Sequence, residues 1–411
     1  MKVLVINCGS STLKFHLINI EVNDAAHGQE SRLMHGIFDG IGAKVTMRLT
    51  VNNNEQTVEE LELSNHTEAT EHLLNWLERR RHLGLNSIEA VGHRVVHGGD
   101  QFIEPTLIND DVVNYIEALS ILAPLHNEPS INAIKAVREI INNDIPVVAV
   151  FDTAFHCTLP ERAWRYALPH EVAARHHVRR YGFHGLAHRF MTERYAEISQ
   201  RSLGQVNLIT LQLGNGCSAA AVKGGCSVDT SMGFTPLEGL MMGTRSGDID
   251  PSVVGYLSSV EGVDVQEVDH WLNTQSGLFG VSGRSMDMRE LLEAELQGDA
   301  LSALAIDMFC YRVRKYIGAY LAVLGGANAI VFGGGIGENA PSIRTRICDG
   351  LEWCGVVLDE ASNVATTGTE GRISTDDSEI QAYVIPPDES LVIARDTVDC
   401  LKRHWLKPIN G

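Results

Sequence analysis

The stretch that decides the fold is KVLVINCGSSTLKFHLINI, residues 2–20. Residues 2–6 are a short apolar run that predicts a buried strand, Cys8-Gly-Ser-Ser predicts a turn, and residues 13–20 predict a returning strand. A similar arrangement recurs half a chain later, where the strand-like run 206–213 is followed by Gly214-Asn-Gly-Cys-Ser and a second run, 219–222. Two such hairpins indicate a duplicated domain, because a recurring pattern can mark a repeated structural unit.

Strands and helices alternate through the rest of the chain. Apolar runs predict buried strands at 90–96, 146–151 and 329–332, and helices are predicted at 71–81, 111–122, 130–141, 301–324, from about 341, and at 390–402. This alternation predicts α/β domains with largely parallel sheets. The domain change is expected just after strand 146–151, and the last helix can cross back. We therefore predict an N-terminal domain of residues 1–151 plus 390–411 and a C-terminal domain of residues 152–389.

Composition narrows the class of protein. The chain has 411 residues with 44% hydrophobic and 21% charged residues, which is ordinary for a soluble globular protein of two or three domains. A formal charge of −19 argues against nucleic acid or an anionic membrane as partner. Eight scattered cysteines indicate reduced thiols and a cytoplasmic location. The uncharged run 317–337 is long enough to span a membrane, but its glycines and Asn328 divide it into a helix end, a turn, a strand and a glycine loop.

Five short runs carry side chains that can bind phosphate or its metal ion. Four of them, 5–11, 92–99, 243–248 and 333–339, contain glycine and contribute Asn7, Arg94 and Arg245, whereas the fifth, 150–156, contains no glycine and contributes Asp152. Glycine allows close approach of the backbone, arginine offers a planar fork to phosphate oxygens, and a carboxylate suits a magnesium ion that keeps several waters. Together the runs predict a phosphoryl-transfer site assembled from distant parts of the chain.

Each of these residues also has a purely structural interpretation. The turn at Asn7 can be a polar hairpin turn, Lys14 a solvated strand residue, and either arginine part of a structural salt bridge. Asp152 and Glu389 follow apolar strands and can simply start the next segment. His184 can be a satisfied core histidine.

Two motifs point to other chemistry. The i, i+4 histidine pairs His93/His97 and His184/His188 have the spacing of a zinc site but lack its glutamate, so catalytic zinc is disfavoured. The run Gly335-Ile-Gly-Glu-Asn-Ala imitates a dinucleotide fingerprint, and a strand, glycine loop and helix there can equally hold a nucleotide. The chain contains no Walker A pattern, which excludes a P-loop ATPase.

In this order, the runs resemble the acetate kinase family and its propionate and butyrate kinase relatives. The matching segments cover most of the chain: 3–14, 92–99, 122–127, 150–159, 179–188, 213–216, 229–248, 276–289, 331–339 and 384–397. The resemblance implies an α/β fold of two duplicated actin-like (ribonuclease H-like) domains around a nucleotide cleft, with the nucleotide site in the C-terminal domain, and a homodimer. It also implies reversible transfer of a phosphoryl group from ATP to a small carboxylate, giving acyl phosphate and ADP, with Mg²⁺ (or Mn²⁺).

The resemblance also assigns roles to residues. The catalytic residues would be Arg94, Asp152, Arg245, His184 and His126. The carboxylate and its methyl group would contact Arg94, Val96, Leu125, Phe183 and Pro236. The nucleotide would contact Lys14, Asn215, Gly216, Asp287, Met288, Arg289, Gly335, Ile336 and Asn339, and the metal ion Asn7, Asp152 and Glu389.

The chain departs from the family pattern at three places. Gln212 stands where the family usually has histidine, Glu128-Pro129 replaces Pro-Ala, and Leu186-Ala187 replaces Thr-Ser. These departures leave a propionate-preferring kinase as the main alternative. A non-catalytic actin-like nucleotide-binding protein and an NAD-dependent dehydrogenase are weaker alternatives.

Overall fold

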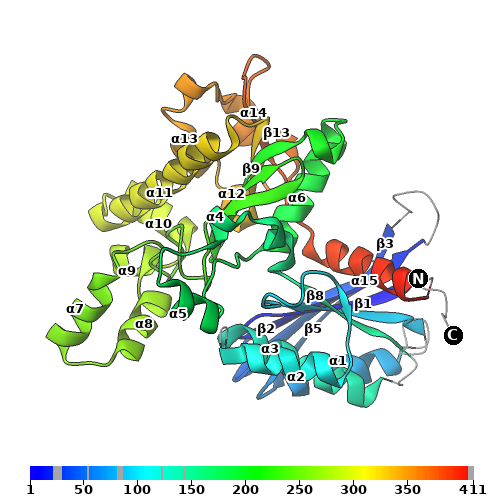
Figure 1. The fold of residues 1–411 in the computed structure, drawn as a ribbon. Coiled ribbons are helices and arrows are strands. Elements are labelled where there is room, and N and C mark those ends of the chain that lie inside the picture. Colours follow the sequence, from blue (N-terminus) through cyan, green and yellow to red (C-terminus); the bar gives the residue numbers. More distant parts are fainter. Residues whose placement is uncertain (22–29, 53–54, 81–86, 122–123, 142–144, 406–411) are drawn as a thin grey trace. The chain divides into compact units, whose positions relative to one another are not determined.

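The computed structural model describes residues 1–21, 30–52, 55–80, 87–121, 124–141 and 145–405, without the side chains of residue 55 and residues 121–126. The chain divides into two units (Figure 1). Unit 1 consists of Met1–Ala154 and Asp388–Gly411, and unit 2 of Phe155–Pro387. Each unit has its own sheet and its own helices.

Unit 1 is built on an eight-stranded sheet with the strand order β5-β4-β3-β2-β1-β6-β8-β7. The strands are β1 (Lys2–Cys8), β2 (Thr12–Ile20), β3 (Glu30–Asp39), β4 (Lys44–Val51), β5 (Glu55–Glu62), β6 (Ala90–Val95), β7 (Thr106–Leu107) and β8 (Val147–Phe151). β1 and β2 form the predicted antiparallel hairpin, and β1, β6 and β8 run parallel to one another. The carboxyl ends of these three parallel strands therefore meet at one edge of the sheet.

The strands β3, β4 and β5 were not predicted. In β4 the side chains of Val45, Met47, Leu49 and Val51 are buried in strict alternation, which is the period of a half-buried strand. β5 forms the edge of the sheet and carries several glutamates. Charged side chains on an edge strand discourage pairing with another chain.

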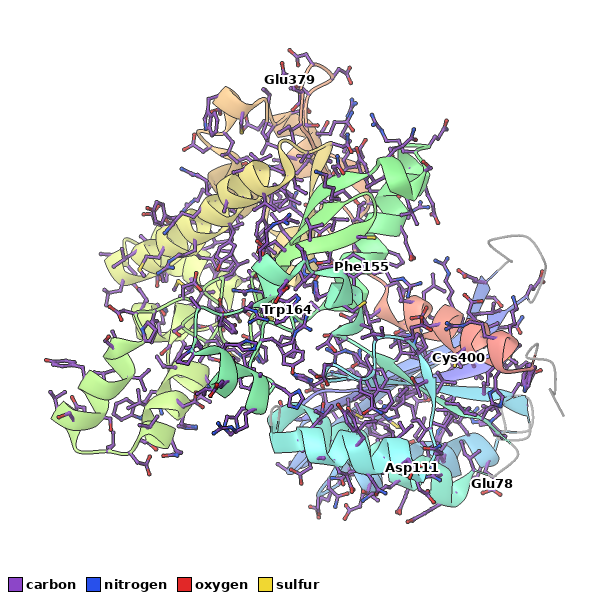
Figure 2. All side chains as sticks on the ribbon, viewed as in Figure 1. Glu78, Asp111, Phe155, Trp164, Glu379 and Cys400 are labelled. Carbon is purple, nitrogen blue, oxygen red and sulfur yellow. The ribbon has the colours of Figure 1, made fainter. Side chains whose placement is uncertain are left out.

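Helices cover both faces of the sheet in unit 1. α1 (His66–Glu78), α2 (Asp110–Ala118) and α3 (Pro124–Ile140) lie on one side, and α15 (Glu389–Trp405) lies on the other (Figure 1). The labels Asp111 on α2 and Cys400 on α15 mark these two layers in Figure 2. α15 packs closely on β6, because a Cβ built at Gly92 would lie 2.3 Å from Thr397 Oγ1. α3 begins six residues before the predicted start at 130 and continues through Pro129.

Unit 2 repeats the sheet topology of unit 1. Its strand order is β11-β10-β9-β12-β14-β13, with β9 (Asn207–Leu213), β10 (Cys217–Lys223), β11 (Cys226–Thr230), β12 (Ala329–Gly333), β13 (Gly371–Arg372) and β14 (Gln381–Val384). β9, β10 and β11 are antiparallel neighbours, whereas β9, β12 and β14 are parallel. The order β11-β10-β9-β12-β14 thus corresponds to β3-β2-β1-β6-β8, which confirms the predicted duplicated α/β fold.

Helices occupy most of the sequence of unit 2 after residue 250. Its helices are α4 (Glu161–Trp164), α5 (His170–Arg175), α6 (Gly185–Ile198), α7 (Ser252–Glu261), α8 (Val265–Thr274), α9 (Gly277–Ser282), α10 (Met288–Leu296), α11 (Ala300–Leu324), α12 (Gly334–Asn339), α13 (Pro341–Cys348) and α14 (Glu360–Ala365). α6 and α11 flank the sheet on its two sides (Figure 1).

The uncharged run 317–337 has the divided structure that its glycines predict. α11 ends at Leu324, Gly325 follows in the left-handed conformation, and β12 begins at Ala329. The glycine run enters α12 directly, so the predicted glycine loop is the first turn of a helix. Within the described residues, no helix has both the length and the apolar character needed to cross a membrane.

Candidate active site

In unit 1, four of the predicted site residues form one hydrogen-bonded cluster. Asn7 lies near the end of β1, Arg94 near the end of β6, Asp152 directly after β8, and Glu389 at the start of α15. Arg94 Nη2 donates to Asp152 Oδ2 at 2.9 Å, and Arg94 Nη1 donates to Asn7 Oδ1 at 3.2 Å. Asn7 Nδ2 donates in turn to Glu389 Oε2 at 3.1 Å. Residues 382 positions apart in sequence are thus brought together at one edge of the sheet.

Burial makes the charges of this cluster interact strongly. The Asp152 side chain is fully buried and that of Arg94 is 14% exposed. Burial alone would lower the pKa of Arg94, but its attraction to Asp152 and Glu389 more than offsets this, so the pKa is raised. Burial raises the pKa of Glu389, although Arg94 acts in the opposite direction. The cluster therefore contains two carboxylates close to a single guanidinium, and additional positive charge would stabilise it.

The remaining predicted residues of unit 1 are Lys14, Val96, Leu125 and His126. Lys14 pairs with Asn7 across the β1–β2 hairpin, and its charge favours the ionised form of Glu389. Val96 follows β6 and is buried. Leu125 and His126 belong to α3, but their side chains lie outside the described residues.

In unit 2, His184 and Arg245 converge on Gly216. A Cβ built at Gly216 would lie 3.5 Å from His184 Nε2 and 3.6 Å from Arg245 Nη1. His184 precedes α6 and adopts the left-handed conformation, with φ 55° and ψ 29°. A side chain held there costs about 1–3 kcal/mol and is typical of functional sites. Its Nδ1 lies 2.9 Å from Ser218 Oγ, on the strand that follows the Gly214–Gly216 turn.

Arg245 is a half-buried cation among uncharged groups. Within the described residues its hydrogen-bond acceptors are the carbonyl of Pro236, at 3.2 Å from Nη1, and the sulfur of Met242, at 3.9 Å. Burial lowers the pKa of Arg245. A buried guanidinium beside a carbonyl and a thioether has unused capacity to bind an anion.

The loop that carries Arg245 is held against the Gly214–Gly216 turn. Gly243 N donates to Asn215 O at 2.9 Å, and a Cβ at Gly243 would lie 1.9 Å from Asn215 Oδ1. A side chain at position 243 would displace the Asn215 side chain, so glycine here allows the two segments to lie against each other. Asn215 thereby links the Arg245 loop to the neighbouring cavity.

The cavity of unit 2 has a volume of about 580 Å³, which is within the range of small-molecule sites. Part of its lining comes from residues just after the carboxyl ends of the parallel strands β9 and β12, the edge at which ligands bind in α/β sheets. It is lined by Gly214, Asn215, Met286, Asp287, Met288, Arg289, Leu292, Gly335, Ile336, Asn339, Ala340, Pro341 and Ser342. The structure thus brings together seven of the nine residues predicted to contact a nucleotide. Gly216 follows Asn215 in the turn, and Lys14 belongs to unit 1.

The two remaining predicted residues of unit 2 flank the His184–Arg245 region. Phe183 is buried, and its carbonyl accepts a hydrogen bond from His156 Nε2 at 3.0 Å. Pro236 orients Arg245 through its carbonyl. Gln212, the departure on β9, has a buried Oε1 that finds no hydrogen-bond partner among the described residues.

Sequence reasoning missed the residues that support His184. His188 was weighed as a zinc ligand, yet the described residues contain no cluster of three or more His, Cys, Asp or Glu able to hold a metal ion. Instead, His188 bonds to Thr210 Oγ1 and Ser218 Oγ. The i, i+4 spacing was the available signal, and its partners come from the β9–β10 hairpin.

Comparisons with known proteins agree with this architecture. The model of the Acetokinase family matches residues 2–395. The chain is 48% identical over 407 residues to a protein named acetate kinase from Solibacter usitatus, with 98% of each chain covered. A crystal structure of Porphyromonas gingivalis acetate kinase superposes with a TM-score of 0.88 at 41% identity, covering 97% of this chain and 99% of that one. A propionate kinase from Francisella tularensis superposes with a TM-score of 0.89, also at 41% identity and with the same coverage.

Fold and similarity together define a class, the phosphotransferases that use a carboxyl group as acceptor and are built from two actin-like units. The two solved structures named above share the fold of this chain. The chain belongs to the Acetokinase family.

Proposed function

We propose that this protein transfers a phosphoryl group reversibly between ATP and acetate, giving acetyl phosphate and ADP. The observation that carries this proposal is the environment of Arg245. Its guanidinium is half-buried, has only a carbonyl and a thioether as acceptors among the described residues, and stands beside His184 at Gly216. Such a pair of donors suits the equatorial oxygens of a phosphoryl group, which carry the developing charge in the transition state.

Arg94 is proposed to bind the acetate carboxylate. Its Nε is buried and has no hydrogen-bond partner among the described residues, while Nη1 and Nη2 are held by Asn7 and Asp152. The guanidinium is therefore oriented, and because these two bonds use only two of its five N–H groups, it keeps donors for a substrate. A carboxylate is already ionised near neutral pH, so the reaction needs positioning and charge stabilisation but no general base.

The cavity of unit 2 is proposed to hold the nucleotide. Gly335 and Ile336 at the start of α12 and Asp287–Arg289 at the start of α10 form facing parts of its lining. Asn215 and Gly216 continue this lining toward Arg245, so a nucleotide seated in the cavity would direct its phosphates toward the Arg245 loop.

A divalent cation fits the cluster of unit 1. Asp152, Glu389 and the amide oxygen of Asn7 are the oxygen donors that Mg²⁺ or Mn²⁺ prefers. Burial, together with the charge of Asp152, raises the pKa of Glu389, so a bound cation would favour its ionised form. Mg²⁺ commonly binds through one or two carboxylates together with waters and phosphate oxygens. When bound, such an ion would neutralise charge on the phosphates.

The preference among short carboxylates is proposed to depend on Val96, Phe183 and Pro236, together with Leu125. One methylene corresponds to about 0.8 kcal/mol of burial, so acetate and propionate differ little in the binding energy available. The similarity to a propionate kinase makes propionate the second candidate substrate.

A hydroxamate assay tests the activity. The purified protein is incubated with Mg-ATP and acetate, propionate or butyrate, and hydroxylamine traps any acyl phosphate. Carboxylate-dependent hydroxamate is expected, with acetate giving the highest rate, and Arg245→Leu serves as the inactive control. Folded, ATP-binding protein that forms no hydroxamate would overturn the proposal, and a highest rate with propionate would replace acetate as the substrate.

We further propose a cytoplasmic homodimer, with α11 at the contact between the two copies. Leu301, Leu304, Met308 and Tyr311 form an exposed apolar stripe at helical spacing, while the opposite face of α11 is buried in the core. Light scattering after size exclusion should show a dimer that the Leu304→Glu/Met308→Glu variant converts to monomers. The matched control Leu168→Glu, at another exposed leucine, should stay dimeric. A dimer unaffected by the double change would place the contact elsewhere.

A further inference from the structure

A chain of hydrogen bonds runs from β9 to His184. Thr210 Oγ1 lies 2.7 Å from His188 Nδ1, and His188 Nε2 lies 2.8 Å from Ser218 Oγ. Ser218 Oγ lies 2.9 Å from His184 Nδ1. Thr210, His188 and Ser218 are fully buried, so these bonds are shielded from bulk water.

His188 is neutral within this chain. Burial lowers its pKa well below the ordinary value, and the neighbouring His156 and His184 act in the same direction. A neutral imidazole has one nitrogen that donates and one that accepts. Ser218 has one hydroxyl proton, so with neutral histidines the protons can be ordered in only two ways along the chain, one the reverse of the other.

Thr210 selects between the two directions. Across the part of the chain that the structure describes, the only hydrogen-bond partner of its hydroxyl is His188 Nδ1. In the reversed order this buried O–H would have no acceptor among the described residues. Loss of that hydrogen bond lowers the population of the reversed order by roughly 5- to 150-fold relative to the other order. Thr210 therefore donates to His188, His188 Nε2–H donates to Ser218, and Ser218 donates to His184 Nδ1.

We propose that Thr210, His188 and Ser218 are positioning residues that hold neutral His184 in the tautomer with its proton on Nε2. Because Nδ1 accepts from Ser218, the ring proton must be on the other nitrogen. Nε2 is the nitrogen that faces the space at Gly216 beside Arg245. The arrangement supplies a fixed N–H donor there, and a donor that needs no reorganisation during the reaction is the effective kind. That its acceptor is a phosphoryl oxygen rests on the proposed function.

Neutron diffraction from perdeuterated wild-type crystals near neutral pH tests the proton order directly. Deuterium is expected on His184 Nε2 and His188 Nε2, with the Ser218 hydroxyl directed at His184 Nδ1. Deuterium on His184 Nδ1 would overturn the proposal. The result does not depend on turnover, so a failure of the proposed activity and a failure of the proton order remain distinguishable.

Two substitutions of Thr210 test its role. Thr210→Val removes the donor with little change of shape, and Thr210→Ser is the matched control that keeps it. In Thr210→Val, deuterium should be shared between both nitrogens of His184. Turnover should fall about two- to tenfold with the KM for ATP unchanged, because only part of the protein retains the donor. Thr210→Ser should behave like wild type; a single Nε2 tautomer in Thr210→Val, or an equal loss in both variants, would refute the assignment to Thr210.

Discussion

Replacing Arg245 by leucine is expected to remove most of the turnover without lowering stability. Loss of one charge contact to the transition state typically reduces the rate about 10²- to 10³-fold. Among the residues that the structure describes, however, Arg245 gains only one carbonyl bond, at 3.2 Å, and a contact with sulfur at 3.9 Å. Folding also lowers the pKa of Arg245, so its charged form is less favourable in the folded than in the unfolded chain. An apolar residue there should be neutral or stabilising.

Hydroxamate formation and thermal unfolding, measured on the same preparations, separate the two effects. Arg94→Leu is the comparison, because it removes the 2.9 Å ion pair of the fully buried Asp152. Removing one partner of a buried ion pair lowers the free energy of unfolding by about 3–5 kcal/mol, so this variant should lose activity and melt at a lower temperature. The reasoning fails if Arg245→Leu melts as early as Arg94→Leu, or if it retains turnover within about tenfold of wild type.

Three further outcomes are expected. Gly216→Ala should fold normally, since the new Cβ makes only ordinary contacts with His184 and Arg245. Because this Cβ fills the space between the two side chains, kcat/KM should fall about 10²-fold, and an unchanged kcat/KM would place the phosphoryl group elsewhere. Gln212→Leu removes a buried oxygen that has no hydrogen-bond partner in the described part of the chain. The free energy of unfolding should therefore be unchanged or higher by up to about 1 kcal/mol, and a clear loss of stability would contradict this environment. Burial lowers the pKa of His93 to about 4, so as the pH falls the unfolded chain binds a proton at His93 before the folded protein does. The contribution of His93 to stability should be fully present above about pH 6.5 and fall toward pH 4, and a melting temperature that stays constant across that window would refute the shift.

The repeated hairpin was predictable because it is a local feature. In both halves an apolar run ends at a glycine turn and is followed by a second apolar run, which predicts β1–β2 and β9–β10 without knowledge of the rest. The convergence of Asn7, Arg94 and Asp152 was also accessible. Each lies at the end of a strand, and in unit 1 those strands prove to be parallel neighbours. Chain direction alone then brings their side chains to one edge.

Other features depend on contacts between distant segments. β5 is rich in glutamate and has no continuous apolar run, so only its pairing with β4 reveals it as a strand. The helix α3 passes through Pro129, a residue that normally limits helices, and local propensity placed its start too late. The spacing of His184 and His188 was visible, but its meaning depends on Ser218 and Thr210, which approach from another hairpin.

The return of the chain to unit 1 has a consequence for biosynthesis. Unit 2 is one continuous segment, Phe155–Pro387, whereas unit 1 needs Asp388–Gly411 in addition to its first 154 residues. A nascent chain emerging from the ribosome can therefore complete unit 2 while the sheet of unit 1 still lacks α15, the helix that packs against Gly92. Glu389 joins Asn7 only after the 382 positions that separate them have been translated. A chain that terminates before this helix cannot assemble the carboxylate cluster, so synthesis must pass residue 389 before the proposed metal site can form.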